Sequence, residues 1–422
     1  MQNCAAAPGI GPGPNICRKD DLLMSLTLSQ RCLRIAPSAT LAIDAKAKAL
    51  IAAGEDVISF GAGEPDFDTP EYIRDAAKSA LDLGMTRYTA VAGTMALRTE
   101  ICKKLLRDNH LEYDPSEIIV SNGAKQSLFN ALSALLNPGD EVLLPAPCWV
   151  SYPEMVCMAG GVPVLVKAGE GLCATAADLE PYVTQNTKAL ILNSPNNPCG
   201  TVWDEAALRD IAQLAVDKGF YVISDEIYEK LIYDGLKHVS IAQISPAIRE
   251  QTIVVNGLSK SFAMTGWRVG YAAASRPIVK AMTAFQSHST SAPNTMAQHA
   301  AAVALTNGED EIERMRQEFD TRRRLMYNWV GRIDGLSARL PQGAFYMMLD
   351  ISRLIGKRFD GRLIEGAMDF AELLLQDGKV AVVPGTAFGA DDHVRMSYAT
   401  SRERIMRGME RIGVFVSKLR SI

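Results

Sequence analysis

The sequence predicts an α/β fold, in which a large domain with a mostly parallel central sheet flanked by helices is followed by a smaller α/β domain. From about residue 118, apolar runs of strand length alternate with stretches whose apolar residues recur at helical spacing. The runs are continuously apolar, which is typical of strands buried on both faces of a parallel sheet. After residue 307 the pattern changes to a long charged stretch and then to further short elements. This change predicts the second, smaller domain.

The first strand and helix of this pattern are predicted between residues 118 and 136. Residues 118–120 form a strand-like run, which leads through residues 121–123 into a helix. The Asn-Pro-Gly sequence at residues 137–139 ends that helix, because proline and glycine do not readily continue one. The helix has apolar residues at spacings of three and four: Leu128, Ala131, Leu132, Leu135 and Leu136.

The remaining elements follow in order along the chain. Asp204 and Gly219 are typical residues for the start and the end of a helix, which we expect at residues 204–218. The basic run at residues 322–324 is interpreted as a solvent-facing part of a charged helix. Further strands of the large domain are expected at residues 142–144, 162–166, 189–192, 221–224 and 253–255. The smaller domain is expected to contain a charged helix at 309–332, an apolar stretch at 343–349, a helix near 361–375 and strands at 380–383 and 393–397.

The expected domain organisation has four parts. Residues 1–24 are rich in Gly, Pro and Ala and are expected to be a disordered extension, with Met24 as an alternative start. Residues 25–70 are expected to form an N-terminal arm and part of the small domain. Residues 71–308 then form the large domain, and residues 309–422 the small C-terminal domain.

Composition places the protein among ordinary globular proteins. It has 422 residues, 48% of them apolar, and a formal net charge of −4. We therefore expect neither a disordered or fibrous chain nor a nucleic-acid partner. No run approaches the roughly 20 apolar residues of a membrane span, so no membrane association is expected. The eight cysteines lack C-x-x-C spacing and the five histidines lack H-x-x-x-H spacing. This pattern predicts no metal, reduced thiols and a cytoplasmic location.

Four motifs carry the functional signal. They are Ala62-Gly63-Glu64-Pro65-Asp66-Phe67-Asp68-Thr69-Pro70, Asn193-Ser194-Pro195-Asn196-Asn197-Pro198, Ser224-Asp225-Glu226-Ile227-Tyr228 and the stretch from Ser259-Lys260 to Arg268. A lysine such as Lys260, placed after a buried strand, is by itself more often structural than nucleophilic. In this order and spacing, however, the motifs resemble those of the class I/II (fold-type I) pyridoxal-phosphate aminotransferases. The resemblance covers residues 26–419 and is strongest to the bacterial-type aspartate aminotransferases.

The resemblance implies pyridoxal 5′-phosphate as the cofactor and suggests which residues bind it in the large domain. Lys260 is expected to hold the cofactor covalently and then to move a proton during catalysis. Asp225 is expected beside the ring nitrogen, where a carboxylate favours the protonated ring. Tyr228 and Asn197 are expected to donate to the phenolic oxygen, and Trp149 to stack on the ring. Asn197 and Trp149 are also expected to contact the substrate.

The phosphate of the cofactor needs hydrogen-bond donors. Gly123 and Ala124 open a predicted helix, whose N-terminal N–H groups and dipole favour an anion. Arg268 adds a permanent charge that can bond in a bidentate manner, and Ser259 precedes the lysine. Tyr88 matches a tyrosine that reaches the phosphate bound by the neighbouring subunit. The resemblance therefore implies a homodimer with shared active sites.

The resemblance also implies how an amino-acid substrate is bound. Arg395 matches the arginine that binds the α-carboxylate, assisted by the backbone N–H of Gly63. Lys125 and Thr40 match residues that bind a side-chain carboxylate, which favours aspartate and glutamate as substrates. Members active on prephenate tend to carry a lysine where this chain has Ala36, which argues against prephenate.

These residues together predict an aspartate aminotransferase, which transfers an amino group between L-aspartate and 2-oxoglutarate by a ping-pong mechanism. The alternatives are a glutamate/aspartate-prephenate aminotransferase and another class I aminotransferase that acts on aromatic or neutral amino acids. A C–S lyase or an aminocyclopropane-carboxylate synthase shares the cofactor motifs, and Lys125 with Thr40 argues against both. A regulator with an aminotransferase-like domain would need a DNA-binding domain before it, and only a short tail is expected there. A nucleotide-binding protein would need a glycine-rich motif that this sequence lacks.

Overall fold

The computed structural model describes residues 28–421 except 30–31, 34, 36–38 and 170–171. The chain divides into two units, residues 1–36 and 37–422, and the description below concerns the second. The expected disordered extension, the alternative start at Met24, and Ala36 lie outside the described residues. The four-part domain division stays a prediction.

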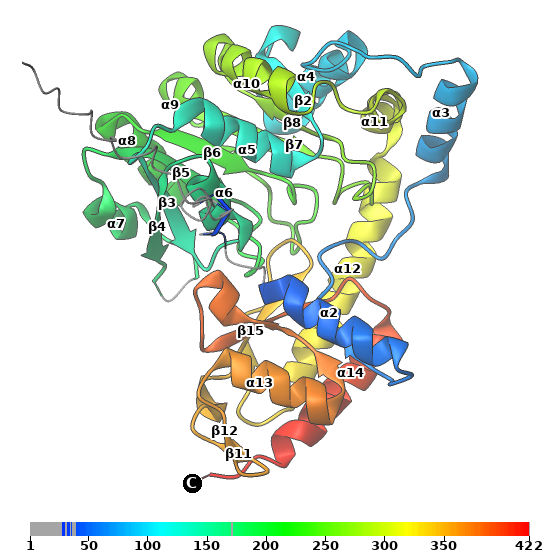
Figure 1. Ribbon diagram of the computed structural model, residues 1–422, viewed down its shortest axis with the longest axis vertical. Coiled ribbons are helices and arrows are strands. Elements are labelled where there is room, and N and C mark those ends of the chain that lie inside the picture. The colour runs from blue at the N-terminus through cyan, green and yellow to red at the C-terminus, as the bar shows by residue number, and fades with distance from the viewer. Residues whose placement is uncertain (1–27, 30–31, 34, 36–38, 170–171, 422) are drawn as a thin grey trace, which may run out of the picture. The chain divides into compact units, whose positions relative to one another are not determined.

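A seven-stranded sheet forms the centre of the larger part of the second unit (Figure 1). Its order is β2-β8-β7-β6-β5-β3-β4, and only β8 runs antiparallel to its neighbours. The strands are β2 (Ile118–Ser121), β3 (Glu141–Ala146), β4 (Val162–Lys167), β5 (Thr187–Asn193), β6 (Tyr221–Asp225), β7 (Thr252–Gly257) and β8 (Gly270–Ala273). The mostly parallel sheet is confirmed, and each expected strand of the large domain lies within an observed one. The pattern did not predict β8, because a short strand of Gly, Tyr and two Ala has little apolar bulk.

Helices cover both faces of this sheet, because successive side chains of a strand point to opposite sides. Ile191 belongs to the hydrophobic core on the side of α5 (Ala124–Leu135), whereas the neighbouring Leu190 belongs to the core on the side of α8 (Glu205–Lys218). The other helices around the sheet are α3 (Glu71–Asp82), α4 (Met95–Asn109), α6 (Ser151–Met158), α7 (Ala176–Leu179), α9 (Pro246–Gln251), α10 (Arg276–Ser289) and α11 (Thr295–Asn307).

Helix α8 begins and ends at the residues that its sequence predicts. The side chain of Asp204 accepts a hydrogen bond of 2.8 Å from the N–H of Ala207, which satisfies one of the free donors of the first turn. Gly219 ends the helix with φ +74°, a left-handed conformation that glycine adopts without strain.

The smaller part contains the long helix α12 (Glu309–Val330) and an antiparallel sheet of order β14-β15-β10-β9. Residues 361–375 form a short strand and a short helix rather than one helix, and the expected strand at 380–383 is divided between β13 and β14. The elements are β9 (Ser337–Ala338), β10 (Tyr346–Asp350), β11 (Arg358–Phe359), β12 (Arg362–Leu363), α13 (Ala367–Leu373), β13 (Val380–Ala381), β14 (Val383–Pro384), β15 (His393–Ser397) and α14 (Arg402–Ser417).

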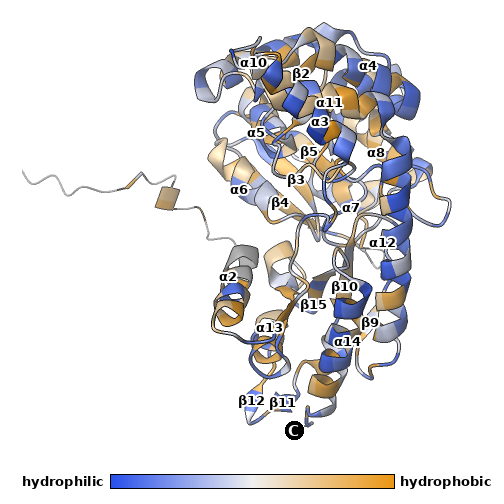
Figure 2. Ribbon diagram, turned by 90° about the vertical axis from the view of Figure 1, so that its right-hand side faces the viewer, coloured by the Kyte–Doolittle hydropathy of each residue, from blue (hydrophilic) through white to orange (hydrophobic). Residues whose placement is uncertain are grey.

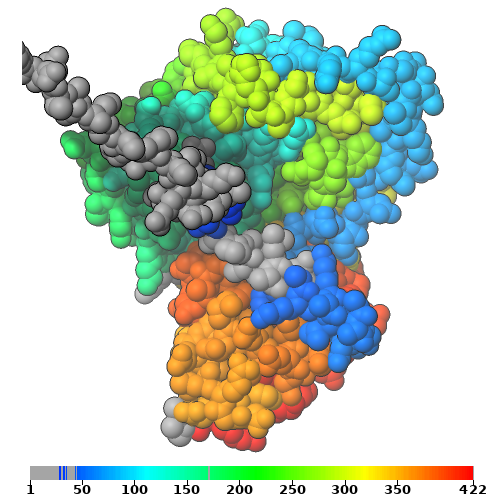
Figure 3. Space-filling view, viewed as in Figure 1, coloured from blue at the N-terminus to red at the C-terminus, as the bar shows by residue number. Residues whose placement is uncertain are grey.

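The beginning of the second unit joins its C-terminal elements. Strand β1 (Ile58–Ser59) pairs in parallel with β13. Helix α2 (Ala39–Ala52) lies against β13 and β14, so that residues far apart in sequence share one surface (Figure 3). Among the described residues, no helix combines the length and apolar character needed to cross a bilayer.

The interpretation of the basic run as solvent-facing is wrong for two of its three arginines. Helix α12 is mostly hydrophilic along its length (Figure 2). Arg323 is nevertheless fully buried and forms an ion pair of 2.8 Å with Asp234. Arg322 is also buried and pairs with Asp66 at 2.7 Å. Both partners come from distant segments, so a pattern along the helix alone could not reveal them.

Candidate active site

A cavity of about 570 Å³ lies at the carboxyl ends of the central parallel strands. Loops that follow β5, β6 and β7 bring Asn197, Tyr228 and Lys260 to it, and Asp225 ends β6. This is where open α/β sheets place their ligands, because the loops after neighbouring parallel strands meet at one edge. The cavity brings together eleven of the predicted residues: Gly63, Ala124, Lys125, Trp149, Asn197, Asp225, Tyr228, Ser259, Lys260, Arg268 and Arg395.

Two predicted residues that the structure describes, Gly123 and Tyr88, do not line the cavity of their own chain, and a third, Thr40, is not described at the level of its side chain. Gly123 lies one residue before α5, behind Ala124. Thr40 belongs to α2, but its side chain lies outside the description. Tyr88 lies between α3 and α4 and is 94% exposed. Its proposed contact with a neighbouring subunit stays a prediction.

Lys260 presents a reactive amine to the cavity. Its Nζ donates a hydrogen bond of 2.6 Å to the carbonyl oxygen of Gly63. Burial lowers the pKa of Lys260 to about 8; the carboxylate of Glu64 opposes this shift, and the cations of Arg268 and Arg395 add to it. A pKa this close to neutrality leaves part of the population as the free amine, which is the form that attacks carbonyl groups.

Asp225 ends β6 and is only 3% exposed. The hydroxyl of Tyr152 donates to its Oδ2 at 2.6 Å, and the N–H of Ile227 donates to Oδ1 at 3.3 Å. Burial raises the pKa of Asp225 to about 6, although both donors act to lower it. Both of these donors are neutral, so the carboxylate can accept a further, positively charged donor from the cavity. Tyr152 was not predicted, although it follows Trp149 by three residues, which is about the spacing of one helical turn.

Arg395 lies in the middle of β15 and is 4% exposed. Its Nη1 donates to Asn197 Oδ1 at 3.1 Å and its Nη2 donates to the carbonyl of Gly61 at 3.2 Å. Its guanidinium carbon lies 4.4 Å from the ring centre of Tyr346, and its buried Nε has no partner. Within the described part of the chain, no carboxylate forms an ion pair with Arg395. A buried cation with a free donor is suited to bind an anionic ligand.

Tyr228 and Tyr346 meet in the same cavity, whose lining also includes Asn197. Their hydroxyl oxygens lie 3.0 Å apart, and both side chains are buried. The N–H of Asn197 donates to Asn193 Oδ1 at 2.8 Å, which fixes the start of the loop after β5. Tyr346, on β10, was not predicted, because the apolar stretch around it marks only a buried strand.

A second anion-binding corner lies at the start of α5. Gly123 has φ +85°, and a Cβ on it would lie 2.5 Å from Nη2 of Arg268. Only glycine therefore lets this guanidinium approach the first turn of α5. Gly270 is equally close-packed, since its Cβ would lie 2.1 Å from the backbone nitrogen of Ala124. The N–H groups of the first turn and the nearby arginine are suited to bind an anion.

Lys125 and Trp149 lie together on another wall of the cavity. The Nζ of Lys125 donates to Ser151 Oγ at 3.2 Å and lies 4.7 Å from the centre of the Trp149 ring. Burial and the nearby Arg268 lower the pKa of Lys125. The ring of Trp149 meets that of Tyr152 edge-on, with centroids 5.3 Å apart. Two charged residues that were not predicted, Lys48 and Glu64, also line the cavity.

Comparisons with known proteins identify the family to which the chain belongs. The family model "Aminotransferase class I and II" matches residues 55–412. The chain belongs to this family. It is a pyridoxal-phosphate-dependent aminotransferase of the aspartate aminotransferase family, and such enzymes act on amino acids and oxo acids. The prediction of the family is thus confirmed.

Relatives and solved structures cover nearly the whole chain. An aspartate aminotransferase of Geobacillus stearothermophilus is 47% identical over 93% of this chain and 99% of its own. A probable aspartate/prephenate aminotransferase of Aquifex aeolicus is 46% identical over 91% of this chain and 97% of its own. The crystal structure of the Rhizobium meliloti aspartate aminotransferase covers 94% of this chain and 100% of its own, with TM-score 0.91 and 42% identity. Relatives named aspartate aminotransferase and aspartate/prephenate aminotransferase are therefore about equally identical to this chain.

Proposed function

We propose that the protein is an aspartate aminotransferase, which moves the amino group between L-aspartate and 2-oxoglutarate. One observation carries this proposal. The cations that line the cavity include Arg395 on one wall and Lys125 on another, both suited to carboxylates, in addition to Lys48, Lys260 and the proposed phosphate corner at Arg268. A dicarboxylic amino acid has two carboxylates to pair with them.

The residues of the cavity fit pyridoxal 5′-phosphate. When bound, this cofactor supplies an electrophilic carbon and an electron-withdrawing ring that stabilises negative charge on the substrate's Cα. The amine of Lys260 would hold it covalently, and the first turn of α5 with Arg268 and Ser259 would bind its phosphate. Asp225, a buried carboxylate held only by neutral donors, would accept a proton-bearing ring nitrogen.

Other residues of the cavity would orient the substrate, transfer the proton and contact the ring of the cofactor. Arg395 would bind the α-carboxylate and so orient the Cα–H bond toward Lys260. The lysine, as a free amine, would take the proton from Cα and return it to the neighbouring carbon of the cofactor. Tyr228 and Asn197 would donate to the phenolic oxygen, and Trp149 would cover the ring from water.

Substrate choice within the family is the finer part of the proposal. Lys125 and Thr40 would pair with the side-chain carboxylate of aspartate or glutamate. The second candidate is an aspartate/prephenate aminotransferase, which is favoured by the similarity to the Aquifex aeolicus protein. Ala36 stands where prephenate-using members tend to have lysine, and for this reason we place the plain aspartate enzyme first.

We further propose a homodimer, in which the exposed Tyr88 reaches the phosphate bound by the partner subunit. Scattered thiols without C-x-x-C spacing support a reducing, cytoplasmic location.

The proposal is tested by following the visible absorption of the bound cofactor. Purified protein should carry this absorption, and Lys260→Ala should lose it; if it persisted unchanged, the assignment of Lys260 would be wrong. Single amino acids are then added one at a time to the wild-type enzyme. Aspartate and glutamate should discharge the absorption fastest. Faster discharge by aromatic or neutral amino acids would overturn the dicarboxylic assignment, and amino transfer from the enzyme to prephenate would favour the second candidate.

A further inference from the structure

The segment after β6 carries functional side chains on one side and buried charges on the other. Asp225 and Tyr228 line the cavity. Glu226 and Glu229 are absent from the lining and are buried behind it. These four residues lie on one short turn at the end of β6. The N–H of Glu229 donates to the carbonyl of Glu226 at 2.9 Å and closes this turn.

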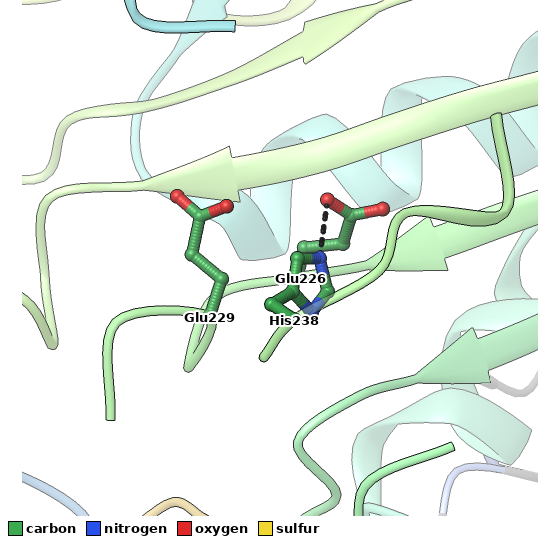
Figure 4. Close-up of side chains that lie close together, drawn as sticks. All are labelled: Glu226, Glu229 and His238. Atoms are coloured by element: carbon green, nitrogen blue, oxygen red, sulfur yellow. Dashed lines mark hydrogen bonds and ion pairs between the residues drawn. The ribbon is translucent and has the colours of Figure 1, made fainter. Parts of the chain in front are cut away.

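Glu226 is held by three side-chain donors in the interior. The hydroxyls of Ser224 and Ser240 donate to its Oε1 at 2.8 and 2.6 Å. Nε2 of His238 lies 2.9 Å from Oε2, as the dashed line in Figure 4 marks. Burial acts against a charge on His238, but the carboxylates of Glu226 and Glu229 raise its pKa above the ordinary value. The histidine thus tends toward the cationic form, which compensates the buried carboxylate.

Glu229 is held by two residues of α4. It forms an ion pair with Lys104, and both side chains are more than nine-tenths buried. Asn109 joins the pair, since it accepts from Lys104 Nζ at 2.7 Å and donates to Glu229 Oε2 at 2.8 Å. The turn is therefore tied to a helix that contributes no residue to the cavity lining.

The cluster of Glu226, Glu229 and His238 also has the spacing of a metal site, since one ligand atom from each lies within 4.8 Å of the others. Two observations argue for internal pairing instead. Lys104 already supplies the positive charge beside Glu229. The void next to Glu229 and Lys104 measures about 20 Å³, which is room for about one water molecule.

We propose that the His238–Glu226 and Lys104–Glu229 pairs are positioning pairs, which hold the turn so that Asp225 and Tyr228 face pyridoxal phosphate in a fixed orientation. The inference rests on the proposed cofactor site. Hydrogen bonds have narrow preferences in distance and angle, and a ligand site needs its groups fixed to within about 0.5 Å. The ion pairs of Glu226 and Glu229 provide this restriction, and neither glutamate lines the cavity.

The test compares two charge-removing variants and measures the effect of each on folding alongside its effect on cofactor binding. Glu229→Gln loses the ion pair with Lys104 but keeps the size and an acceptor oxygen. Asp320→Asn is the matched control, because it removes a carboxylate paired with the buried Arg323, away from the cavity. The measurements are the dissociation constant of pyridoxal 5′-phosphate, the visible circular dichroism of the bound cofactor, and Tm.

For Glu229→Gln we expect the dissociation constant to rise at least tenfold and the visible circular dichroism to shrink. Asp320→Asn should change both by less than threefold at a comparable loss of Tm. A rise for Glu229→Gln no larger than that of the control would overturn the inference. Failure of the wild-type protein to bind the cofactor would instead overturn the proposed function, so the two failures can be told apart.

A double variant separates positioning from stability. Lys104→Met with Glu229→Leu replaces the pair by apolar side chains of similar size, which often restores stability. We expect Tm to recover while the dissociation constant stays raised, because the directional contact between the turn and α4 is then missing. If Tm and the dissociation constant both returned to the wild-type values, the Lys104–Glu229 pair would only stabilise the fold, and the inference would be wrong. If Tm does not recover, the comparison with Asp320→Asn decides.

Discussion

Replacing Arg395 by methionine should affect catalysis and stability in opposite directions. The guanidinium is 4% exposed, has no carboxylate partner among the described residues, and has a buried Nε without a partner. Free of substrate, it is therefore a buried and incompletely compensated charge. With substrate, it is the group proposed to bind the α-carboxylate.

The expected changes in kcat/KM and in the free energy of unfolding follow from the states with and without substrate. A hydrogen bond to a charged group contributes about 1.5–3 kcal/mol, so losing a bidentate contact costs about 3–6 kcal/mol. At 1.36 kcal/mol for each factor of ten, kcat/KM should fall by about 10²–10⁴-fold. Replacing an uncompensated buried charge by an apolar side chain of similar length should raise the free energy of unfolding by about 1–4 kcal/mol.

The assay measures kcat/KM for aspartate and for alanine, together with denaturant unfolding in the absence of substrate. Both substrates have an α-carboxylate, so both should lose activity to a similar extent. Arg395→Lys is the control; it keeps the charge but not the planar fork, and should fall between the wild type and Arg395→Met. A loss restricted to aspartate, or a loss of less than tenfold for both substrates, would refute the proposed role. A lower unfolding free energy would refute the view of Arg395 as an uncompensated charge.

Three further predictions follow from the same cavity. Lys125→Ala should lower kcat/KM for aspartate by at least tenfold more than for alanine, because only aspartate has a second carboxylate; equal losses would contradict the pairing. Asp225→Asn should become more stabilising as pH rises from about 4 to about 6. The folded-state pKa of Asp225 is raised from 3.8 to about 6, so the ionised wild type becomes less stable through that window, by up to about 3 kcal/mol. Chemical unfolding at pH 4 and pH 7 measures this difference, and a pH-independent effect would argue against the raised pKa. Tyr152→Phe removes a donor that lowers the pKa of Asp225. The acidic limb of the pH profile of kcat should therefore move to higher pH, and an unmoved limb would exclude this hydrogen bond as a determinant.

Some features of the site could be read along the chain and others could not. Lys260 and Asp225 lie in motifs that resemble those of the class I/II aminotransferases, beside strands with a strong apolar signal, so their place at one edge of the sheet could be predicted. Tyr152 and Tyr346 were missed, since a buried aromatic residue gives the same pattern whether it supports the core or faces a ligand. Arg322 and Arg323 were interpreted as solvent-facing because the helix pattern contains no information about acidic residues on distant segments.

The sequence by itself determined the order of the elements and the loops that follow the parallel strands. Apolar runs of strand length, separated by capped helices, leave few arrangements other than a covered parallel sheet. In such a sheet the loops bearing Asn197, Tyr228 and Lys260 must meet at one edge. Only the tertiary structure decided how buried these groups are and which partners they have. Burial and partners set the pKa of Lys260 near 8 and that of Asp225 near 6. Likewise, Gly61 and Arg395 meet only because the two ends of the described fold pack together.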